Sequence, residues 1–306
     1  MKHKFFRSLL LALVPLCLLA QVPVTRNSTK PKAKPKTEQT AKPAPAKKKT
    51  NQAAKSSGGQ RTSASASSSR QSISSQTFTV NGVSFDMMYV KGGTFTMGAT
   101  SEQGSDADSD EKPTHRVTLS NFYIGKYEVT QALWEAVMGS NPLNWKGANF
   151  PVTTVIWNDC QTFIRKMNAL TGKNFRLPTE AEWEFAARGG NNSRGYKYAG
   201  SNIISDVAWY DDNSGSKTHV VGTKSPNELG IYDMSGNVWE LCQDWYGSYS
   251  SASQTNPTGA SSGLERVLRG GCCCDVAGYC RSSFRDDITP LYRPYYCGLR
   301  LVLSQL

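Results

Sequence analysis

The composition of this chain changes abruptly near residue 77, and the change limits where a folded domain can lie. Residues 21–76 contain no Phe, Trp or Tyr and consist mainly of Lys, Pro, Ala, Thr, Ser and Gln. Such a segment cannot bury enough apolar surface to offset the entropy lost on folding. We therefore expect residues 21–76 to be a disordered, extended linker, and one folded domain over residues 77–306.

The charge follows the same division. Of 35 Lys and Arg residues, twelve lie in residues 21–76, which contain a single acidic residue. Residues 77–306 hold 20 basic and 23 acidic residues, so their net charge is −3. Because the expected domain has no positive excess to neutralise phosphates, we expect no nucleic-acid partner. The basic linker is expected to be a spacer, with a weak attraction to anionic envelope polymers as a secondary role.

The first twenty residues have the pattern of a secretory signal peptide. Three basic residues precede an apolar run, Leu9 to Leu19, and Ala20 offers a small residue for cleavage. The run is too short to span a membrane. We expect an exported protein, which is secreted, periplasmic or on the cell surface. Lipid anchoring at Cys17 is the less favoured alternative, because Leu16 is large where a small residue is expected.

Turn and capping signals predict the main elements of the domain. Asn81-Gly82 predicts a hairpin between two apolar runs. Further strands are predicted at residues 88–90, 94–97, 116–119 and 122–129, and an acidic loop at residues 101–111. Helices are predicted over residues 131–138 after Thr130, from a capping box at residues 158–161 to Gly172, and from Thr179 to residues 189–190. Periodicity is weak after residue 190, so these elements make an α+β domain with long loops.

Seven stretches of the domain combine Gly, aromatic and acidic residues in a distinctive order. They are YVKGGTFTMG (89–98), YEVT (127–130), PVT (151–153), RLPTEAEWE (176–184), GIYDMSGNVWE (230–240), RGG (269–271) and GLR (298–300). Together they resemble the formylglycine-generating enzyme, or sulfatase-modifying factor, family over essentially all of residues 77–306. The resemblance implies a single α+β domain with the formylglycine-generating-enzyme fold, which is C-type lectin-like and low in regular secondary structure. It does not by itself imply the enzyme's activity.

The resemblance also locates the catalytic site of the enzyme. That enzyme oxidises a substrate Cys to formylglycine with copper held by two thiolates, and the two positions here are Asp275 and Cys280. Cys274 lies one residue early, where an extended chain reverses the side-chain direction. A carboxylate with one thiolate is a poor Cu(I) site. We expect no standard oxidase site, and the alternative is a divergent copper oxidase that uses Cys280 with Cys274.

A second site of the family is matched more closely. The resemblance implies a structural calcium site formed by the side chains of Asp233 and Glu240 and the backbone carbonyls of Gly236 and Val238. Two carboxylates and two carbonyls suit a hard cation with oxygen ligands. The alternative interpretation is a turn held by side-chain hydrogen bonds around a buried Trp239.

The residues from Cys272 to Cys297 have an unusual composition. These 26 residues hold five of the eight Cys and no Lys, Glu, Gln, Met or Trp, whereas those five types supply 37 of the 195 residues from 77 to 271. The bias resembles the variable region of target proteins of diversity-generating retroelements, which use this fold. The fixed framework would then include Arg269, Arg281, Arg285, Arg293 and Arg300. An ordinary, undiversified loop is the equally weighted alternative.

Both interpretations make the C-terminal face a binding surface, because Tyr offers a large rigid contact area with a polar tip. The expected ligand-contacting residues are Tyr279, Phe284, Asp286, Asp287, Tyr292, Tyr295 and Tyr296. We therefore predict an exported protein that binds an unidentified protein or glycan and is not an enzyme. The alternatives are the divergent formylglycine-generating oxidase and a structural protein of the cell envelope.

Overall fold

The computed structural model of the chain describes residues 73–141, 143 and 147–304. The expected signal peptide and almost all of the expected linker lie outside these residues. The first strand, β1 (Ser75–Val80), begins two residues before the expected domain boundary at residue 77. Ser75 and Gln76 already pair with the second strand, so they belong to the folded domain.

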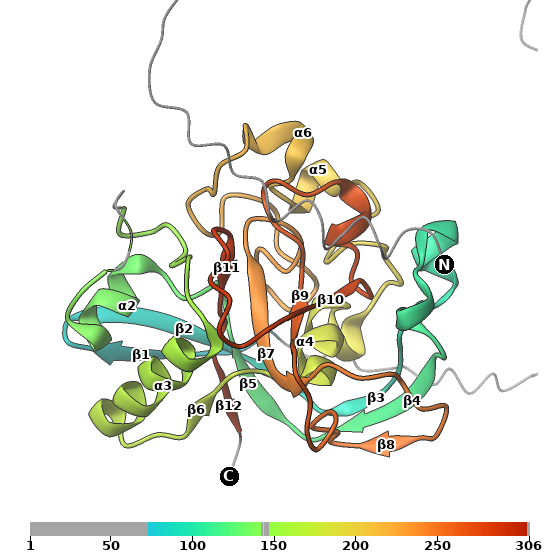
Figure 1. Ribbon diagram of the computed structural model, residues 1–306, viewed down its shortest axis with the longest axis horizontal. Coiled ribbons are helices and arrows are strands. Elements are labelled where there is room, and N and C mark those ends of the chain that lie inside the picture. The colour runs from blue at the N-terminus through green and yellow to red at the C-terminus, as the bar shows by residue number, and fades with distance from the viewer. Residues whose placement is uncertain (1–72, 142, 144–146, 305–306) are drawn as a thin grey trace, which may run out of the picture. The chain divides into compact units, whose positions relative to one another are not determined.

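A five-stranded antiparallel sheet has the order β1-β2-β5-β12-β6. Its other strands are β2 (Val83–Val90), β5 (Phe122–Gly125), β6 (Phe175–Arg176) and β12 (Val302–Ser304). The expected hairpin is confirmed: Val80 pairs with Val83, and Asn81 and Gly82 have φ angles of 46° and 83°. Strand β12 lies between β5 and β6, so the end of the domain is held inside the sheet (Figure 1).

Strand β5 is shorter than the strand predicted over residues 122–129. A Cβ atom at Gly125 would lie 2.9 Å from the Tyr127 carbonyl oxygen, so the chain can turn tightly after the strand only because residue 125 is Gly. Val129 is nevertheless buried in the hydrophobic core. This burial explains why the apolar pattern extends beyond the strand.

The three predicted helices are α2 (Gln131–Met138), α3 (Trp157–Thr171) and α4 (Glu180–Ala187). Helices α2 and α4 begin as predicted, because the hydroxyls of Thr130 and Thr179 accept backbone hydrogen bonds from their first turns at 3.3 and 3.2 Å. Helix α3 begins before the predicted box at residues 158–161. Its cap is the Asp159 carboxylate, which accepts a hydrogen bond from the Ile156 amide at 3.2 Å.

Two further sheets complete the strand structure. The predicted strands at residues 94–97 and 116–119 lie in the three-stranded sheet, whereas the sequence predicted little regular structure for the four-stranded sheet. The four-stranded sheet has the order β10-β9-β7-β11, with β7 (Trp239–Trp245), β9 (Arg266–Arg269), β10 (Arg285–Ile288) and β11 (Cys297–Gly298). The three-stranded sheet β3-β4-β8 contains β3 (Gly93–Met97), β4 (His115–Leu119) and β8 (Gln254–Thr255). Every residue of β9 is buried, so this strand lacks the alternation by which strands are recognised.

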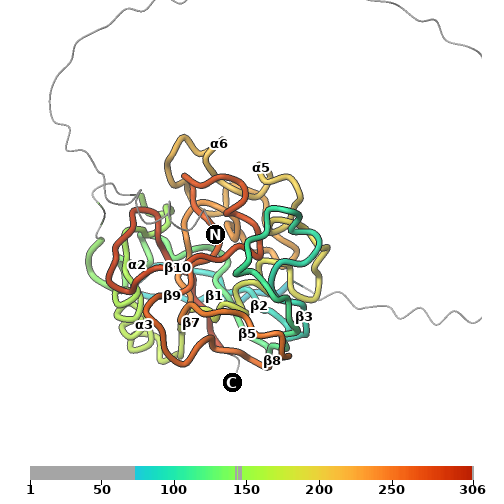
Figure 2. The backbone as a smooth tube through the Cα atoms, turned by 45° about the vertical axis from the view of Figure 1, so that its right-hand side comes forward, coloured from blue at the N-terminus to red at the C-terminus, as the bar shows by residue number. Residues whose placement is uncertain are grey.

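Short helical segments complete the fold. They are α5 (Ile204–Val207), α6 (Asp211–Ser214) and the 3₁₀ segments η1 (Ser101–Asp106), η2 (Ser109–Glu111), η3 (Gly190–Asn192) and η4 (Ala277–Cys280). Segments η1 and η2 occupy the expected acidic loop, where Glu111 is buried rather than solvated. Helices α5 and α6 lie above the four-stranded sheet, next to the chain that follows β9 (Figures 1 and 2).

Two large hydrophobic clusters form the core. One lies where α2 and α3 pack on the five-stranded sheet, with Trp134 stacked on Phe163 at 5.0 Å between ring centroids. The other surrounds Trp183 of α4, between β2, β4 and the four-stranded sheet. The observed class is therefore the expected α+β fold with low regular secondary structure.

Four buried arginines of the C-terminal part of the chain each pair with a buried glutamate. The pairs are Arg269–Glu184 (2.5 Å), Arg281–Glu111 (2.6 Å), Arg285–Glu180 (2.7 Å) and Arg300–Glu240 (2.6 Å). A buried guanidinium needs such a partner, because an unpaired charge in the interior is very costly. The expected framework role thus agrees with the burial of these four residues, whereas Arg293 is partly exposed and pairs with Asp159 at the surface.

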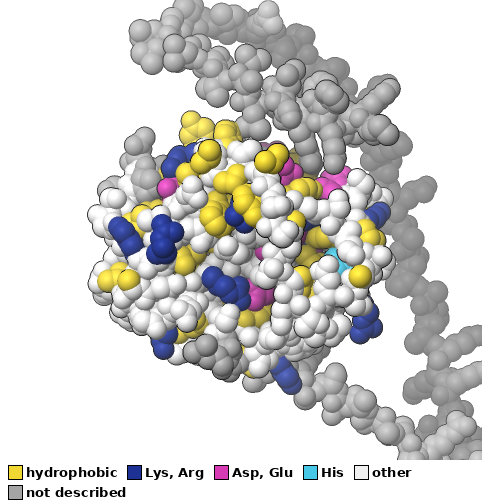
Figure 3. All heavy atoms as spheres, turned by 60° about the horizontal axis from the view of Figure 1, so that its bottom comes forward, with side chains coloured by type: hydrophobic (Ala, Val, Ile, Leu, Met, Phe, Trp, Pro, Cys, Tyr) yellow, Lys and Arg dark blue, Asp and Glu magenta, His cyan; other side chains and the backbone are white. Residues whose placement is uncertain are grey.

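The face below the sheets carries separate Lys, Arg, acidic and hydrophobic groups, and neither charge forms a continuous patch on it (Figure 3). Within residues 73–304, as far as they are described, no helix is long and apolar enough to cross a membrane.

Candidate functional site

The residues from Cys272 to Cys297, called the C-terminal segment below, run from the end of β9 to β11 across the four-stranded sheet. Its first part is tied to the short helices. The Asp211 amide donates to the Asp275 carbonyl at 3.0 Å, and the Ser214 hydroxyl donates to the Cys273 carbonyl. These bonds fix the backbone of residues 273–275 against α6.

The expected ligand-contacting residues fall into two groups. Tyr295 and Tyr292 are 75% and 46% exposed, so their rings are available at the surface. Phe284 is 1% exposed and stacks on Tyr279 at 4.6 Å, which contradicts its predicted role as a contact residue. The Phe284 ring also packs against Trp239, with 6.0 Å between ring centroids, so it belongs to the interior.

The two acidic residues in the predicted set lie on β10. Asp286 and Asp287 are partly buried and pair across the strands with Leu268 and Val267 of β9. Both residues are therefore held in strand β10, whereas Tyr295 and Tyr296 lie in the loop before β11.

A cavity of about 410 Å³ lies beside the exposed tyrosines. Its lining residues are Phe150, Thr153, Thr154, Ser216, Lys217, Thr218, Tyr295 and Tyr296. The Arg293 guanidinium donates to the Thr154 carbonyl at 2.7 Å, and the Thr154 hydroxyl donates to the Tyr295 carbonyl at 3.3 Å. The tyrosine loop is therefore attached to the opposite wall. An apolar hollow with a few polar groups and a flanking lysine is typical of a ligand site.

Sequence reasoning found only the tyrosines of this cavity. Residues 150–154 and 216–218 lie far from the C-terminal segment in the chain, and they contain no sequence motif that indicates ligand binding. The PVT stretch at 151–153 belongs to the family pattern, but it indicated the fold and not a lining role. The left-handed φ angles of Thr154 (59°) and Ser216 (57°), which aim these loops, cannot be read from the sequence.

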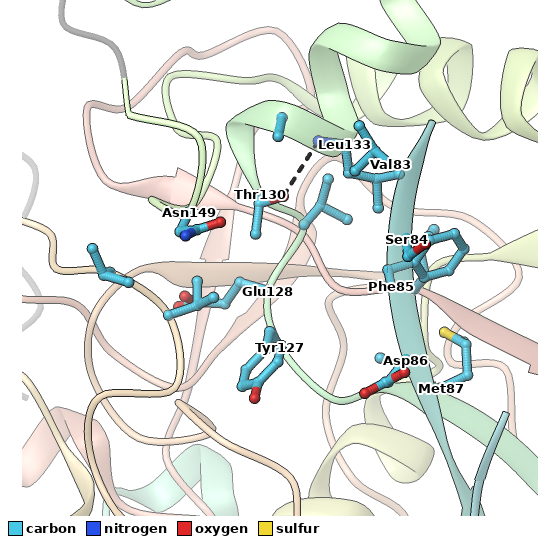
Figure 4. Close-up of a pocket in the computed structure, with 16 residues that line it drawn as sticks. Val83, Ser84, Phe85, Asp86, Met87, Tyr127, Glu128, Thr130, Leu133 and Asn149 are labelled. Atoms are coloured by element: carbon cyan, nitrogen blue, oxygen red, sulfur yellow. Dashed lines mark hydrogen bonds between the residues drawn. The ribbon is translucent and has the colours of Figure 1, made fainter. Parts of the chain in front are cut away.

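A second cavity, of about 480 Å³, lies between β2 and the chain from residue 127 to α2 (Figure 4). Tyr127 and Asp86 lie at one end of it, and Val83 and Leu133 lie at the other. None of the expected ligand-contacting residues lines this cavity. Asp86 accepts a hydrogen bond from Thr77 at 2.7 Å, so one of its polar groups is already engaged. We therefore assign the candidate binding site to the cavity beside Tyr295.

Three consecutive cysteines bring their thiols together next to this site. Cys272, Cys273 and Cys274 form the only group of three or more His, Cys, Asp or Glu residues, within the described part of the chain, whose ligand atoms all lie within 4.8 Å of one another. Cys273 Sγ and Cys274 Sγ are 3.7 Å apart. The Tyr296 hydroxyl lies beside the Cys274 thiol, which connects the thiols with the cavity wall.

The oxidase alternative pairs Cys280 with Cys274. Cys280 is not a member of the thiol group. It is fully buried against Tyr198 and Val207, and burial raises the pKa of its thiol. Burial also raises the pKa of the Asp275 carboxyl, which accepts a hydrogen bond from the Cys272 amide at 2.8 Å. The two positions that bind copper in the enzyme therefore hold a carboxyl group that caps a turn, at Asp275, and a buried thiol outside the thiol group, at Cys280.

The expected calcium ligands lie in a buried region with a surplus of carboxylates. Glu240 pairs with Arg300, but Asp233 and Glu128 are buried near this pair without an arginine of their own. Burial raises the pKa of Asp233 to about 6, and burial together with Asp233 and Glu240 raises the pKa of Glu128 well above its usual range. Carboxylate and carbonyl oxygens are the donors that calcium takes. Asp233, Glu240 and the Gly236 and Val238 carbonyls would hold calcium here.

The fold and the site define a formylglycine-generating-enzyme-type domain with an aromatic-rimmed cavity and without the pair of copper-binding cysteines. The model of the sulfatase-modifying factor enzyme 1-like domain matches residues 74–305. The chain therefore belongs to the sulfatase-modifying factor (formylglycine-generating enzyme) family.

Relatives of known name include both enzymes and other proteins. The formylglycine-generating enzyme of Streptomyces coelicolor is 31% identical, over 65% of this chain and 83% of the enzyme. Chaperone protein LppX of Paenibacillus barcinonensis is 38% identical, over 54% of this chain and 73% of that protein. Treponema denticola variable protein 1 superposes with a TM-score of 0.69 and 33% identity, over 76% of this chain and 99% of that one. The chain is thus similar to proteins named for three different roles.

Proposed function

We propose that the protein is exported and binds a protein or glycan ligand through the cavity beside Tyr295 and Tyr296. The observation that carries this proposal is the exposed Tyr295 ring in the lining of a cavity whose walls are fixed by hydrogen bonds, with the exposed Tyr292 three residues away in the same loop. Rigid tyrosines lose little conformational entropy on binding, and they dominate many binding surfaces. Lys217 in the lining favours a ligand with acidic or carbonyl groups.

The C-terminal segment, which contributes Tyr295 and Tyr296 to this cavity, is built so that its exposed side chains can change. The arginines of the C-terminal part are buried in ion pairs, whereas the rings of Tyr292 and Tyr295 are exposed, so exposed side chains of this loop can vary without disturbing the framework. The similarity to variable protein 1 supports a diversified binding surface. An imperfect repeat of the gene segment for residues 270–300 beside a reverse transcriptase gene would be the genetic sign of it.

A role in the maturation of another exported protein is the second candidate. The 38% identity with a protein named chaperone LppX favours it. In this case the ligand would be a protein client, and the same cavity would contact it. The divergent oxidase is disfavoured because Asp275 replaces the first copper-binding Cys and because Cys280 is buried outside the thiol group.

The binding proposal is tested with the full chain immobilised and probed with a glycan array and a panel of exported proteins. Replacing Tyr292 and Tyr295 by Ala should weaken any specific binding by about 30-fold or more, since loss of anchoring aromatic residues costs about 2 kcal/mol. Ile203→Ala, which removes an equally exposed apolar side chain beside α5, should leave it unchanged. Equal affinity of the double variant and the wild type for every ligand found would exclude this surface.

We also propose that calcium binds at Asp233, Gly236, Val238 and Glu240 and stabilises the fold. The support is the surplus of buried carboxylates in a motif that the family uses for calcium. The calcium would neutralise this charge and connect the turn before β7 to the core.

A further inference from the structure

A tight backbone turn brings the thiols of the three adjacent cysteines together. In an extended chain, successive side chains point to opposite faces, so three adjacent cysteines would separate. Here Gly270 and Gly271 have φ angles of 97° and 71°, which turn the chain directly before Cys272. The Asp275 amide donates to the Cys272 carbonyl at 3.1 Å, which closes a tight turn over the three residues. The convergence therefore comes from the backbone and needs no bond between the sulfurs.

The distances between the sulfurs fit a shared cation better than a disulfide. Two sulfurs bound tetrahedrally at about 2.3 Å from one zinc ion lie about 3.8 Å apart, whereas a disulfide is about 2.05 Å long. Cys273 Sγ and Cys274 Sγ are 3.7 Å apart, and all three sulfurs lie within 4.8 Å of one another. A small movement of the Cys272 sulfur toward the other two would bring all three within bonding distance of one ion.

The three cysteines also contact one another directly. The Cys274 amide donates a hydrogen bond to the Cys272 sulfur at 3.4 Å, and the Cys273 and Cys274 sulfurs lie 3.7 Å apart. Binding of a metal ion by such a group of thiols releases their protons.

A fixed outer layer supports the three thiols. The Cys273 amide donates to the Asn237 carbonyl at 2.9 Å, and the Cys273 carbonyl accepts from Ser214. The Trp239 indole donates to the Asp275 carboxylate, which itself accepts from the Cys272 amide. Outer hydrogen bonds of this kind keep metal ligands in place. Cys274 is partly exposed, so a cation can enter from its side.

We propose that Cys272, Cys273 and Cys274 bind one thiophilic d¹⁰ cation, Zn²⁺ or Cu⁺. Soft thiolates select these ions over calcium or magnesium. The site differs from the copper position of the family's enzymes, which corresponds to residues 275 and 280. Three thiolates satisfy Cu⁺, whereas Zn²⁺ needs a fourth donor, which Tyr296, Asp275 or water can supply. The proposal is independent of the ligand-binding function proposed above.

The test uses the full chain, reduced and freed of reductant without oxygen. Co²⁺ is added as a spectroscopic probe and displaced by Zn²⁺, and Cu⁺ is delivered separately in competition with a chromogenic chelator. We expect one equivalent per chain, with intense thiolate-to-metal absorption for Co²⁺. Cys273→Ser and Cys274→Ser should each lower the affinity for the favoured ion at least tenfold. Cys160→Ala, which removes a buried thiol in α3, is the matched control and should bind normally.

Two further measurements separate loss of binding from loss of folding. Circular dichroism of Cys274→Ser should match the wild type, because this side chain is the least buried of the three. The metal should raise the melting temperature of the wild type and not that of Cys274→Ser, and it should protect Cys274 from alkylation. Unchanged metal affinity in the Cys273→Ser/Cys274→Ser double variant would overturn the proposal. So would absence of binding by the reduced wild type, or a requirement for Cys280 in place of Cys273 and Cys274.

Discussion

Arg281 illustrates how single residues hold the C-terminal segment. Its guanidinium donates to both carboxylate oxygens of Glu111 at 2.6 and 2.7 Å, although the two residues are 170 positions apart in the sequence. Burial opposes ionisation of Glu111, yet hydrogen bonds from Arg281 and Ser283 lower its pKa. The charge pair therefore persists inside the protein and connects η2 to the segment that carries the candidate sites.

Replacing Glu111 by Gln should leave the Arg281 charge buried without its partner. The free energy of unfolding should fall by about 3–5 kcal/mol, the usual cost of breaking a buried ion pair from one side. Asp106→Asn makes the same chemical change in the exposed pair with Lys197 and should have little effect. Chemical denaturation of both variants measures the difference. Equal stability of the two variants would show that the Arg281–Glu111 pair is not a main support.

Asp244 should make the stability depend on pH. Burial, followed by the nearby Glu180, raises its pKa to about 8. The folded state therefore binds a proton that the unfolded state releases near pH 4, so this residue's contribution should be lost as the pH rises from about 4 to about 8. Asp244→Asn, which mimics the protonated form, should be more stable than the wild type above pH 8 by at least about 1 kcal/mol. A variant with the wild-type pH profile would contradict this assignment.

At the scale of elements, caps and tight turns were the features that the sequence could predict. The hydroxyls of Thr130 and Thr179 and the Asn81-Gly82 turn act through neighbours in the chain, so local patterns reveal them. Strand β9 could not be predicted, because both of its faces are buried by segments distant in sequence. The cavity walls at residues 150–154 and 216–218 could not be predicted either, because they meet the tyrosines only in the folded chain. Phe284 was predicted to be a surface residue because the segments that bury it are distant in the sequence.

Helix α4 carries two buried glutamates that form ion pairs with buried arginines, Glu180 with Arg285 and Glu184 with Arg269. The cap at its first turn therefore supports these pairs as well as the helix. Thr179→Ala should lower the free energy of unfolding by about 1 kcal/mol, since the first-turn amide of Glu182 loses its acceptor. Thr179→Ser keeps the hydroxyl and should recover most of the loss. Thermal or denaturant unfolding compares them, and an Ala variant as stable as the Ser variant would argue against a capping role.

At the scale of the whole molecule, calcium should raise the stability of the domain. A cation that binds only the folded state at 100 times its dissociation constant adds about 2.7 kcal/mol. A chelator should therefore lower the melting temperature of the wild type by several degrees. Asp233→Asn suits the local backbone, where φ is 58°, and should abolish this response while it remains folded. A melting temperature that does not change on chelation would remove the calcium proposal.

The family pattern predicted the fold of the whole domain, because its stretches are spread from residue 89 to residue 300. It could not predict the thiol group, since convergence of three adjacent cysteines depends on the tight turn that the Asp275 amide closes with the Cys272 carbonyl. Nor could it predict the four buried ion pairs, whose partners lie between 60 and 170 residues apart. The long-range pairs are the part of the architecture that only three-dimensional placement reveals.

We propose that this member of the family binds a ligand and lacks the oxidase reaction. The most direct measurement incubates the copper-loaded full chain, in the presence of oxygen, with a peptide that carries the sulfatase Cys-x-Pro-x-Arg sequence and follows the peptide by mass spectrometry. We expect that the peptide Cys is not converted to formylglycine, because Asp275 and the buried Cys280 do not form a pair of thiolates. Copper-dependent aldehyde formation that disappears in Cys280→Ser would contradict it.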